Sequence, residues 1–152
     1  YDVLSPGKDS FPQVLNNRHP THMYYFATPF ILNNRGFFSY NLFRKFCDYY
    51  ITGFAKTINK IRPLGLSYVF YPSSVFIDDL PLSMSEYVVA KTAGEKLCIL
   101  YEKKYDIIIY RPRIPRIDTD QTVSVIPIDN EDPIPIQLEH LRLFQDYSIN
   151  RE

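Results

Sequence analysis

Residues 66–74 read LSYVFYPSS, a short apolar run that ends in a proline and two serines. An uninterrupted apolar run bounded by turn residues is typical of a strand buried on both faces, as in a parallel sheet. Residues 22–28 and residues 106–110 have the same character. The sequence therefore predicts three buried strands.

Two helices are predicted between these strands, and the first is amphipathic. Residues 40–61 carry apolar side chains at spacings of three and four, and an Arg-Pro pair followed by a glycine ends the pattern. After a polar loop, a second helix is expected to run from residue 85 to about residue 104, with Ser83 or Ser85 as its N-cap. Alternating strands and helices require parallel pairing with right-handed crossovers, so we expect an α/β fold.

Less regular structure is expected on both sides of this unit. Residues 1–21 contain several turn signals, with room for one short helix. Residues 112–135 hold five prolines and no clear period, and we expect a loop there with a short strand at 123–126. A last amphipathic helix is predicted at residues 136–147.

Size and charge restrict the possible functions. A chain of 152 residues, of which 45% are apolar, suffices for one domain with a hydrophobic core and is too short for two. Lys plus Arg equals Asp plus Glu at 17 each, without a long run of one sign. Nucleic-acid patches and membrane-surface helices need concentrated positive charge, so neither partner is expected. No apolar run is long enough to span a membrane.

The cysteines and histidines predict neither a disulfide nor a metal centre. Cys47 and Cys98 stand outside any CxxC pattern, and we expect two buried free thiols in a reducing compartment, hence a cytoplasmic protein. His19, His22 and His140 are too scattered to suggest metal ligands.

Glycine is scarce in this sequence. None of its five glycines stands in a G-x-G-x-x-G pattern, so no pyrophosphate-binding turn of the usual kind is predicted. The chain begins at Tyr1, within sequence that looks structured, and we expect it to be a fragment of a longer protein.

Tyr87 and Lys91 are the strongest candidates for chemistry. They lie four residues apart on a predicted helix, so both side chains project from one face. A phenol has a pKa of about 10, and a neighbouring ammonium group would lower it toward the range of acid–base catalysis. Ser73 or Ser74, at the end of the preceding strand, would hold a substrate oxygen against the phenol. In an open parallel sheet such groups meet at the carboxyl ends of the strands.

This stretch resembles a known family. YVVAKTAGEKL, residues 87–97, is similar to the Tyr-x-x-x-Lys-x-x-x-Glu helix of the extended, epimerase-like branch of the short-chain dehydrogenase/reductase superfamily. Arg111-Pro112 resembles the Arg-Pro that ends the following strand in that branch. The resemblance covers residues 22 to about 115. It implies a partial, three-layer Rossmann-like fold, a parallel sheet flanked by helices, in one domain that lacks the glycine-rich strand-turn-helix.

The resemblance also assigns roles. Tyr87 would be the catalytic acid and base, and Lys91 would modulate its pKa and bind the cofactor ribose. The substrate-orienting hydroxyl would belong to Ser73, which the strand end favours, or to Ser74, which the 13-residue spacing to Tyr87 favours. The choice between the two serines stays open.

Four further residues would contact the dinucleotide by the same resemblance. Ala27 and Thr28 would line the cofactor at the end of the first strand, and Arg111 and Pro112 would lie near the nicotinamide. The sequence departs from the family at Tyr50, which stands where the family often has the asparagine of its proton relay.

The loop after Arg111 matches no family loop. Its arginines Arg111, Arg113 and Arg116 are expected either to clamp a phosphate or carboxylate or to form ion pairs with Asp118 or Asp120.

The resulting hypothesis is an NAD(P)-dependent oxidoreductase or epimerase/dehydratase that acts on a small molecule, with this chain as its catalytic half. The alternative is a non-catalytic Rossmann-like module used for binding or assembly. Because the pyrophosphate turn is missing, we expect the chain alone to bind NAD or NADP no tighter than about 1 mM.

Two kinds of protein partner are expected. The family commonly dimerises through the two helices that correspond to residues 40–61 and 85–104, so we expect a homo-oligomer. The open strand edge at residues 22–28 is expected to pair with another chain or with the missing N-terminal half, because exposed strand edges promote association.

Overall fold

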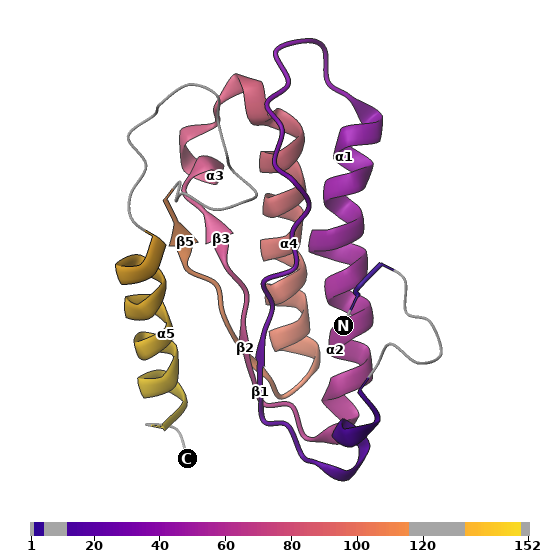
Figure 1. Cartoon of the computed structure of the whole chain (residues 1–152), viewed down its shortest axis with the longest axis vertical. Coiled ribbons are helices and arrows are strands. Elements are labelled where there is room, and N and C mark those ends of the chain that lie inside the picture. The colour runs from indigo at the N-terminus through magenta and orange to yellow at the C-terminus, as the bar shows by residue number, and fades with distance from the viewer. Residues whose placement is uncertain (1, 5–11, 116–132, 150–152) are drawn as a thin grey trace.

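A three-stranded parallel sheet forms the centre of the computed structural model, which describes residues 2–4, 12–115 and 133–149 (Figure 1). Its strands stand in the order β1-β2-β4, and their bounds are β1 His22–Tyr24, β2 Tyr68–Phe70 and β4 Ile108–Tyr110. The predicted α/β fold is therefore confirmed. The strands are shorter than predicted: β1 ends at Tyr24, four residues before the predicted end, and β4 begins at Ile108, two residues after the predicted start.

Helices cover both faces of the sheet (Figure 1). On one face lie α4 (Ser85–Lys104) and a long helical segment made of α1 (Tyr40–Cys47), a π-helical turn (Asp48–Gly53) and α2 (Phe54–Ile61). On the other lies α5 (Pro133–Ile149). Both predicted helices of the first face are confirmed, and the π-helical turn inside the first was not predicted.

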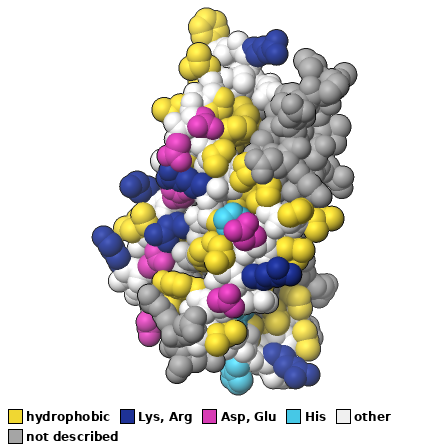
Figure 2. Space-filling view, turned by 90° about the vertical axis from the view of Figure 1, so that its left-hand side faces the viewer, with side chains coloured by type: hydrophobic (Ala, Val, Ile, Leu, Met, Phe, Trp, Pro, Cys, Tyr) yellow, Lys and Arg dark blue, Asp and Glu magenta, His cyan; other side chains and the backbone are white. Residues whose placement is uncertain are grey.

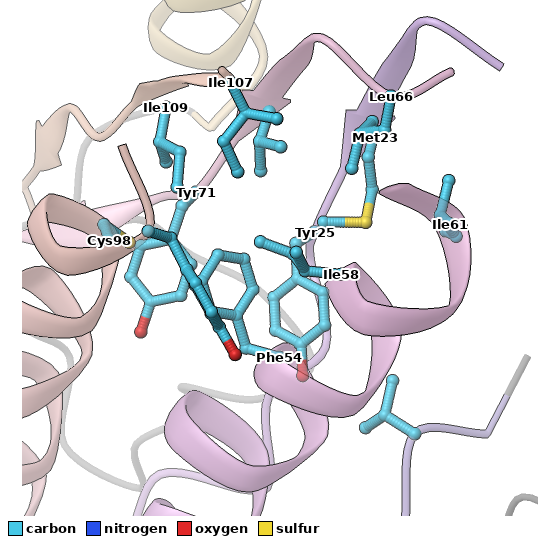
Figure 3. Packing of buried hydrophobic residues seen from close by; sticks show 13 residues of the cluster. Met23, Tyr25, Phe54, Ile58, Ile61, Leu66, Tyr71, Cys98, Ile107 and Ile109 are labelled. Atoms are coloured by element: carbon cyan, nitrogen blue, oxygen red, sulfur yellow. The ribbon is translucent and has the colours of Figure 1, made fainter. Parts of the chain in front are cut away.

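Alternation along each strand builds two separate cores. Side chains that point toward α2 and α4 form the larger cluster, shown in Figure 3, and include Met23, Tyr25, Val69, Tyr71, Ile107 and Ile109. Their neighbours along the strands point the other way, where Phe70 packs edge-on against Phe144 of α5 at 5.6 Å between ring centroids. The sheet is thus buried on both faces, as its apolar strands predicted.

The segment between β2 and α4 is more ordered than the predicted polar loop. It contains the short helix α3 (Phe76–Asp79) and a 3₁₀ turn (Leu82–Met84). Neither Ser83 nor Ser85 caps α4: the N-cap is Met84, without a side-chain cap bond. The Ser85 hydroxyl instead donates to Glu86 at 3.0 Å.

The segments around the last helix also differ from the sequence prediction. A second parallel pair joins β3 (Ser73–Ser74) to β5 (Arg113–Ile114), and nothing in the sequence predicted it. Helix α5 begins three residues earlier than predicted, at Pro133, because proline is tolerated in the first turn of a helix. The predicted strand at 123–126 lies outside the described residues.

Several smaller predictions concern single residue types. Both cysteines are free, but only Cys98 is buried, whereas Cys47 is partly exposed. Within the described ranges, no cluster of three or more His, Cys, Asp or Glu side chains could hold a metal ion. No helix in that part of the chain is long and apolar enough to cross a membrane.

Apolar side chains remain on the surface of both helical layers. Val89 and Leu100 of α4 are exposed, as are Leu138 and Leu143 of α5. On the side of the molecule that carries α5, apolar side chains are interspersed with charged ones (Figure 2). The predicted homo-oligomer stays a prediction.

We predict that another chain pairs with the outer edge of β1. Within the described residues β1 has a neighbour, β2, on one side only. The Thr21 carbonyl and the Tyr25 amide bond toward β2, so the alternate residues His22 and Tyr24 turn their amides to the open side. Hydrogen exchange of the Tyr24 amide should slow as the protein concentration rises. Exchange at the rate of an unpaired loop at every concentration would show that no chain binds there.

The second prediction concerns Gly94 of α4. A Cβ at this position would lie 2.1 Å from the Tyr71 hydroxyl oxygen and 3.1 Å from the Cζ of its ring. Gly94→Ala should therefore lower the free energy of unfolding by about 2 kcal/mol, even though alanine favours helices by about 1 kcal/mol. Gly36→Ala is the matched control, since its Cβ meets only Asn34 at 3.4 Å. Urea unfolding that finds both variants equally stable would refute the close approach.

Candidate active site

The candidate site lies where the carboxyl end of β2 meets the N-terminal half of α4. Tyr87 and Lys91 both face the protein interior from α4, with exposed fractions of 6% and 7%. One helical turn separates them, as predicted. The two side chains that the sequence analysis named as candidates for chemistry therefore lie close together beside the carboxyl end of β2.

The structure separates the two candidate serines. Ser74 shares a hydrogen bond with Tyr87 and accepts another from the Phe76 amide at 3.3 Å. The Ser73 hydroxyl instead donates to Glu95 Oε1 at 2.5 Å. Ser74 is thus the serine that lies beside the phenol, whereas Ser73 binds the carboxylate of Glu95, about two turns further along α4.

Burial dominates the ionisation of Tyr87. It raises the pKa of the phenol to about 12, although the Ser74 hydrogen bond acts in the opposite direction. The expected lowering of this pKa by Lys91 is not found: burial, which disfavours the phenolate, is the largest effect on it. At neutral pH Tyr87 is therefore a protonated phenol.

Lys91 is also governed by burial. Its Nζ donates to the Pro72 carbonyl at 2.7 Å and lies 4.1 Å from the centroid of the Tyr50 ring. Burial lowers the pKa of Lys91 to about 7, and Cys98 and Glu95 oppose this only in part. Near pH 7 the side chain therefore exchanges between ammonium and amine.

The predicted cofactor contacts divide into two groups. Thr28 reaches the site, because its hydroxyl is 2.6 Å from the Tyr50 hydroxyl, and Ala27 packs at the rim of the core beside it. Pro112 is buried, and its carbonyl accepts from the Ser73 amide at 2.8 Å. These residues lie around the strand ends.

Arg111 points elsewhere. Its Nη1 donates to Glu102 at 2.6 Å and to the Ile109 carbonyl at 2.9 Å. Glu102 stands 15 positions after Tyr87 on α4, which corresponds to roughly 20 Å along the helix axis. The structure therefore does not bring the Arg111 guanidinium to the tyrosine.

Of the two predictions for the arginines, an anion clamp or ion pairs, Arg113 fits the second. Its partners are Glu95 and Asp78 and not the predicted Asp118 or Asp120. Its guanidinium binds both oxygens of Glu95, at 3.0 and 2.8 Å, and also contacts Asp78. These acids raise the pKa of Arg113 above its ordinary value. The predicted partners Asp118 and Asp120 lie outside the described residues, as does Arg116.

Glu86 is a buried carboxylate that the sequence analysis missed. It is 0% exposed, and its Oε1 accepts from the Asn34 side chain at 2.5 Å and from the Ser39 amide at 2.6 Å. Burial raises the pKa of Glu86, but these hydrogen bonds outweigh it and leave the pKa below its ordinary value. Through these hydrogen bonds Glu86, the residue before Tyr87, binds the loop that precedes α1. The sequence signal that could have identified Glu86 is its place in the first turn of a predicted helix, where a negative charge is stabilised.

The comparisons with known proteins identify the fold. No protein-family model matches the chain, and no curated protein matches it in sequence. Among solved structures it is similar to an alcohol dehydrogenase from the archaeon Thermococcus sibiricus, determined in complex with 5-hydroxy-NADP, with a TM-score of 0.69 and 16% identity over 86% of this chain. The chain spans 60% of the length of that dehydrogenase. The match confirms a Rossmann-like α/β fold.

The burial of Lys91 predicts a pH-dependent stability. Its folded-state pKa lies below its unfolded value, so the unfolded chain binds more protons above pH 7 and stability rises with pH. Between about pH 7.5 and pH 9 this contribution should add about 2 kcal/mol to the free energy of unfolding. Lys91→Met should remove the rise, because methionine carries no proton to lose. Denaturant unfolding of both proteins at several pH values tests this, and parallel curves would contradict it.

Proposed function

We propose that this chain provides the proton-transfer residues of an NAD(P)-dependent oxidoreductase of the short-chain dehydrogenase/reductase type. The observation that carries the proposal is the convergence of Tyr87, Ser74 and Lys91 at the carboxyl end of a parallel sheet. The likeness to a dehydrogenase bound to an NADP analogue supports it. The substrate class is a small molecule with a reactive carbonyl or hydroxyl group.

The geometry suits carbonyl reduction. Tyr87 is protonated at neutral pH and can donate its proton to a carbonyl oxygen, while the Ser74 hydroxyl, already bonded to it, orients that oxygen. A bound nicotinamide would supply or accept the hydride. In the oxidation direction Tyr87 must become a phenolate, which the Lys91 ammonium would stabilise. An epimerase or dehydratase would use the same groups, because such reactions can begin by oxidising a C–OH group.

The described residues fit the nicotinamide-ribose end of the cofactor. Lys91 Nζ is buried, and the described part of the chain gives it one hydrogen-bond acceptor, the Pro72 carbonyl, for its three N–H groups. Its remaining donors suit ribose hydroxyls. Thr28 belongs to the same site, because its hydroxyl contacts that of Tyr50, whose ring lies against Lys91. None of the five glycines supplies a pyrophosphate turn. The chain alone should accordingly bind NAD(P) no tighter than about 1 mM, about −4 kcal/mol.

One observation favours the alternative of a non-catalytic module. Lys91 is already docked on Pro72 and the Tyr50 ring, and Tyr87 is 6% exposed. A site in this state binds a substrate only if these side chains move. The two hypotheses therefore differ in whether Tyr87 ever meets a reacting oxygen.

The test is consumption of NADPH and NADH with a panel of small aldehydes and ketones. Tyr87→Phe should lower turnover by about 10²- to 10⁴-fold, since it removes the proton donor and leaves the ring. Ser74→Ala should lower it by about tenfold or more, and Ser73→Ala, the matched control, should lower it less.

Two outcomes would contradict the proposal. Turnover that survives Tyr87→Phe would exclude Tyr87 as the acid. Absence of turnover under conditions where calorimetry shows nucleotide binding would favour the non-catalytic module.

A further inference from the structure

Lys91 is a buried cation without a carboxylate partner. None of the ion pairs among the described residues includes it, and Glu95, the nearest acid on its helix face, is committed to Arg113 and Ser73. Aromatic rings surround the amine instead. The distances from Nζ to the ring centroids are 4.1 Å for Tyr50, 5.3 Å for Tyr71 and 5.9 Å for Tyr87. Ring faces attract ammonium groups within about 6 Å.

The Tyr50 ring is both the nearest and the most firmly held. Its hydroxyl lies 2.6 Å from the hydroxyl of Thr28, four residues beyond the end of β1. Phe46 stacks on it at 6.0 Å with an interplanar angle of 6°, and Tyr87 meets it edge-on at 5.8 Å. The side chain is 1% exposed. These contacts pack the ring with its face toward Lys91.

The backbone of Tyr50 is fixed as well. It lies in the π-helical turn Asp48–Gly53, and its carbonyl accepts a hydrogen bond from the Tyr71 hydroxyl at 3.1 Å. π-helical turns of this kind are often found at functional sites. Tyr50 therefore connects three parts of the site: the segment that follows β1, the end of β2 and the helix α4.

We infer that Tyr50 is a positioning residue for Lys91: its ring face holds the ammonium group against the Pro72 carbonyl, and Thr28 locks the ring in place. Calling Lys91 a site residue rests on the proposed function, but the contact itself does not. Tyr50 acts on chemistry only through Lys91 and the edge of the Tyr87 ring.

A ring face distinguishes the two protonation states of the amine. It attracts the ammonium and has little effect on the neutral amine, so Tyr50 opposes the loss of charge that burial promotes. The other titratable groups that face Lys91 are Glu95, Cys98 and Tyr87 on its own helix and Tyr71 on the adjoining strand end. Of these, only Glu95 is charged at neutral pH, and its charge is shared with Arg113.

The test varies the charge of the ring face and preserves its shape. Tyr50→Phe and Tyr50→pentafluorophenylalanine both lack the hydroxyl and therefore lose the Thr28 bond equally, but fluorine withdraws electrons from the ring face. Replacement by 4-fluorophenylalanine and 3,5-difluorophenylalanine gives intermediate steps. The measurement is the pKa of Lys91 from the NMR chemical shift of its ¹³Cε, assigned with Lys91→Met, in the absence of nucleotide.

With Phe at position 50 the pKa of Lys91 should stay within about half a unit of the wild-type value, because the ring face remains. Successive fluorination should lower it, reaching about one unit below the Phe variant for the pentafluoro ring, a tenfold change in the ammonium-to-amine ratio. Phe43→Leu is the control: Phe43 packs against the same cluster, its ring contact is with Phe38 and not with Tyr50 or Lys91, and the change should leave the pKa of Lys91 unchanged.

Identical titrations across the fluorinated series would overturn the inference. So would a shift with Phe43→Leu as large as that with the pentafluoro ring, because general loosening of the core would then explain it. If the pentafluoro protein does not fold, the monofluoro and difluoro variants still give the trend. Since no nucleotide or substrate is present, this result is independent of whether the turnover assay succeeds.

Discussion

A close approach between Tyr71 and Gly94 determines how the sheet meets its main helix. The ring at the end of β2 crosses α4 at the residue that has no side chain, and its hydroxyl continues to the Tyr50 carbonyl. A hydrogen bond thereby joins the sheet to the π-helical turn across α4. The position of Lys91 follows, because it lies one turn before Gly94 and projects between the rings of Tyr50 and Tyr71.

Helix α4 holds two buried ionisable groups, and the protein treats them differently. Glu86 receives N–H and O–H donors from Asn34, Ser39 and Ser85, so its charge is compensated where it lies. Lys91 donates to one carbonyl and otherwise contacts ring faces, which stabilise an ion less than the hydrogen-bond donors around Glu86 do. The carboxylate therefore stays ionised and serves as an anchor, whereas the amine can change its charge near neutral pH. A single helix thus combines a permanent structural charge with an adjustable one.

The parts of this structure that follow from periodicity were accessible from the sequence. Apolar runs predicted the three strands, and spacings of three and four predicted the helical segment over residues 40–61. The expected helix from residue 85 to about residue 104 matches α4. The failures involve interactions between distant segments. The Ser73 hydroxyl is engaged by Glu95, which accepts a hydrogen bond from it, so Ser74 is the serine left beside Tyr87. Arg113 pairs with Glu95 and Asp78, not with the acids that follow it in sequence. Residues 73–74 and 113–114 form a sheet too short to leave a pattern.

The same close approach limits how this sequence can drift. A side chain at position 94 needs the space that the Tyr71 hydroxyl occupies, and that hydroxyl in turn supports the turn containing Tyr50. A substitution at position 94 is therefore tolerated only after a substitution at position 71 has made room for it. Tyr71 must be replaced by a smaller residue before Gly94 can be replaced by a larger one. A protein without the Tyr71 hydroxyl must then stabilise the π-helical turn by other contacts. Among distant relatives the pair should change together, as an epistatic unit that sequence comparison could recognise where overall identity is too low to detect kinship.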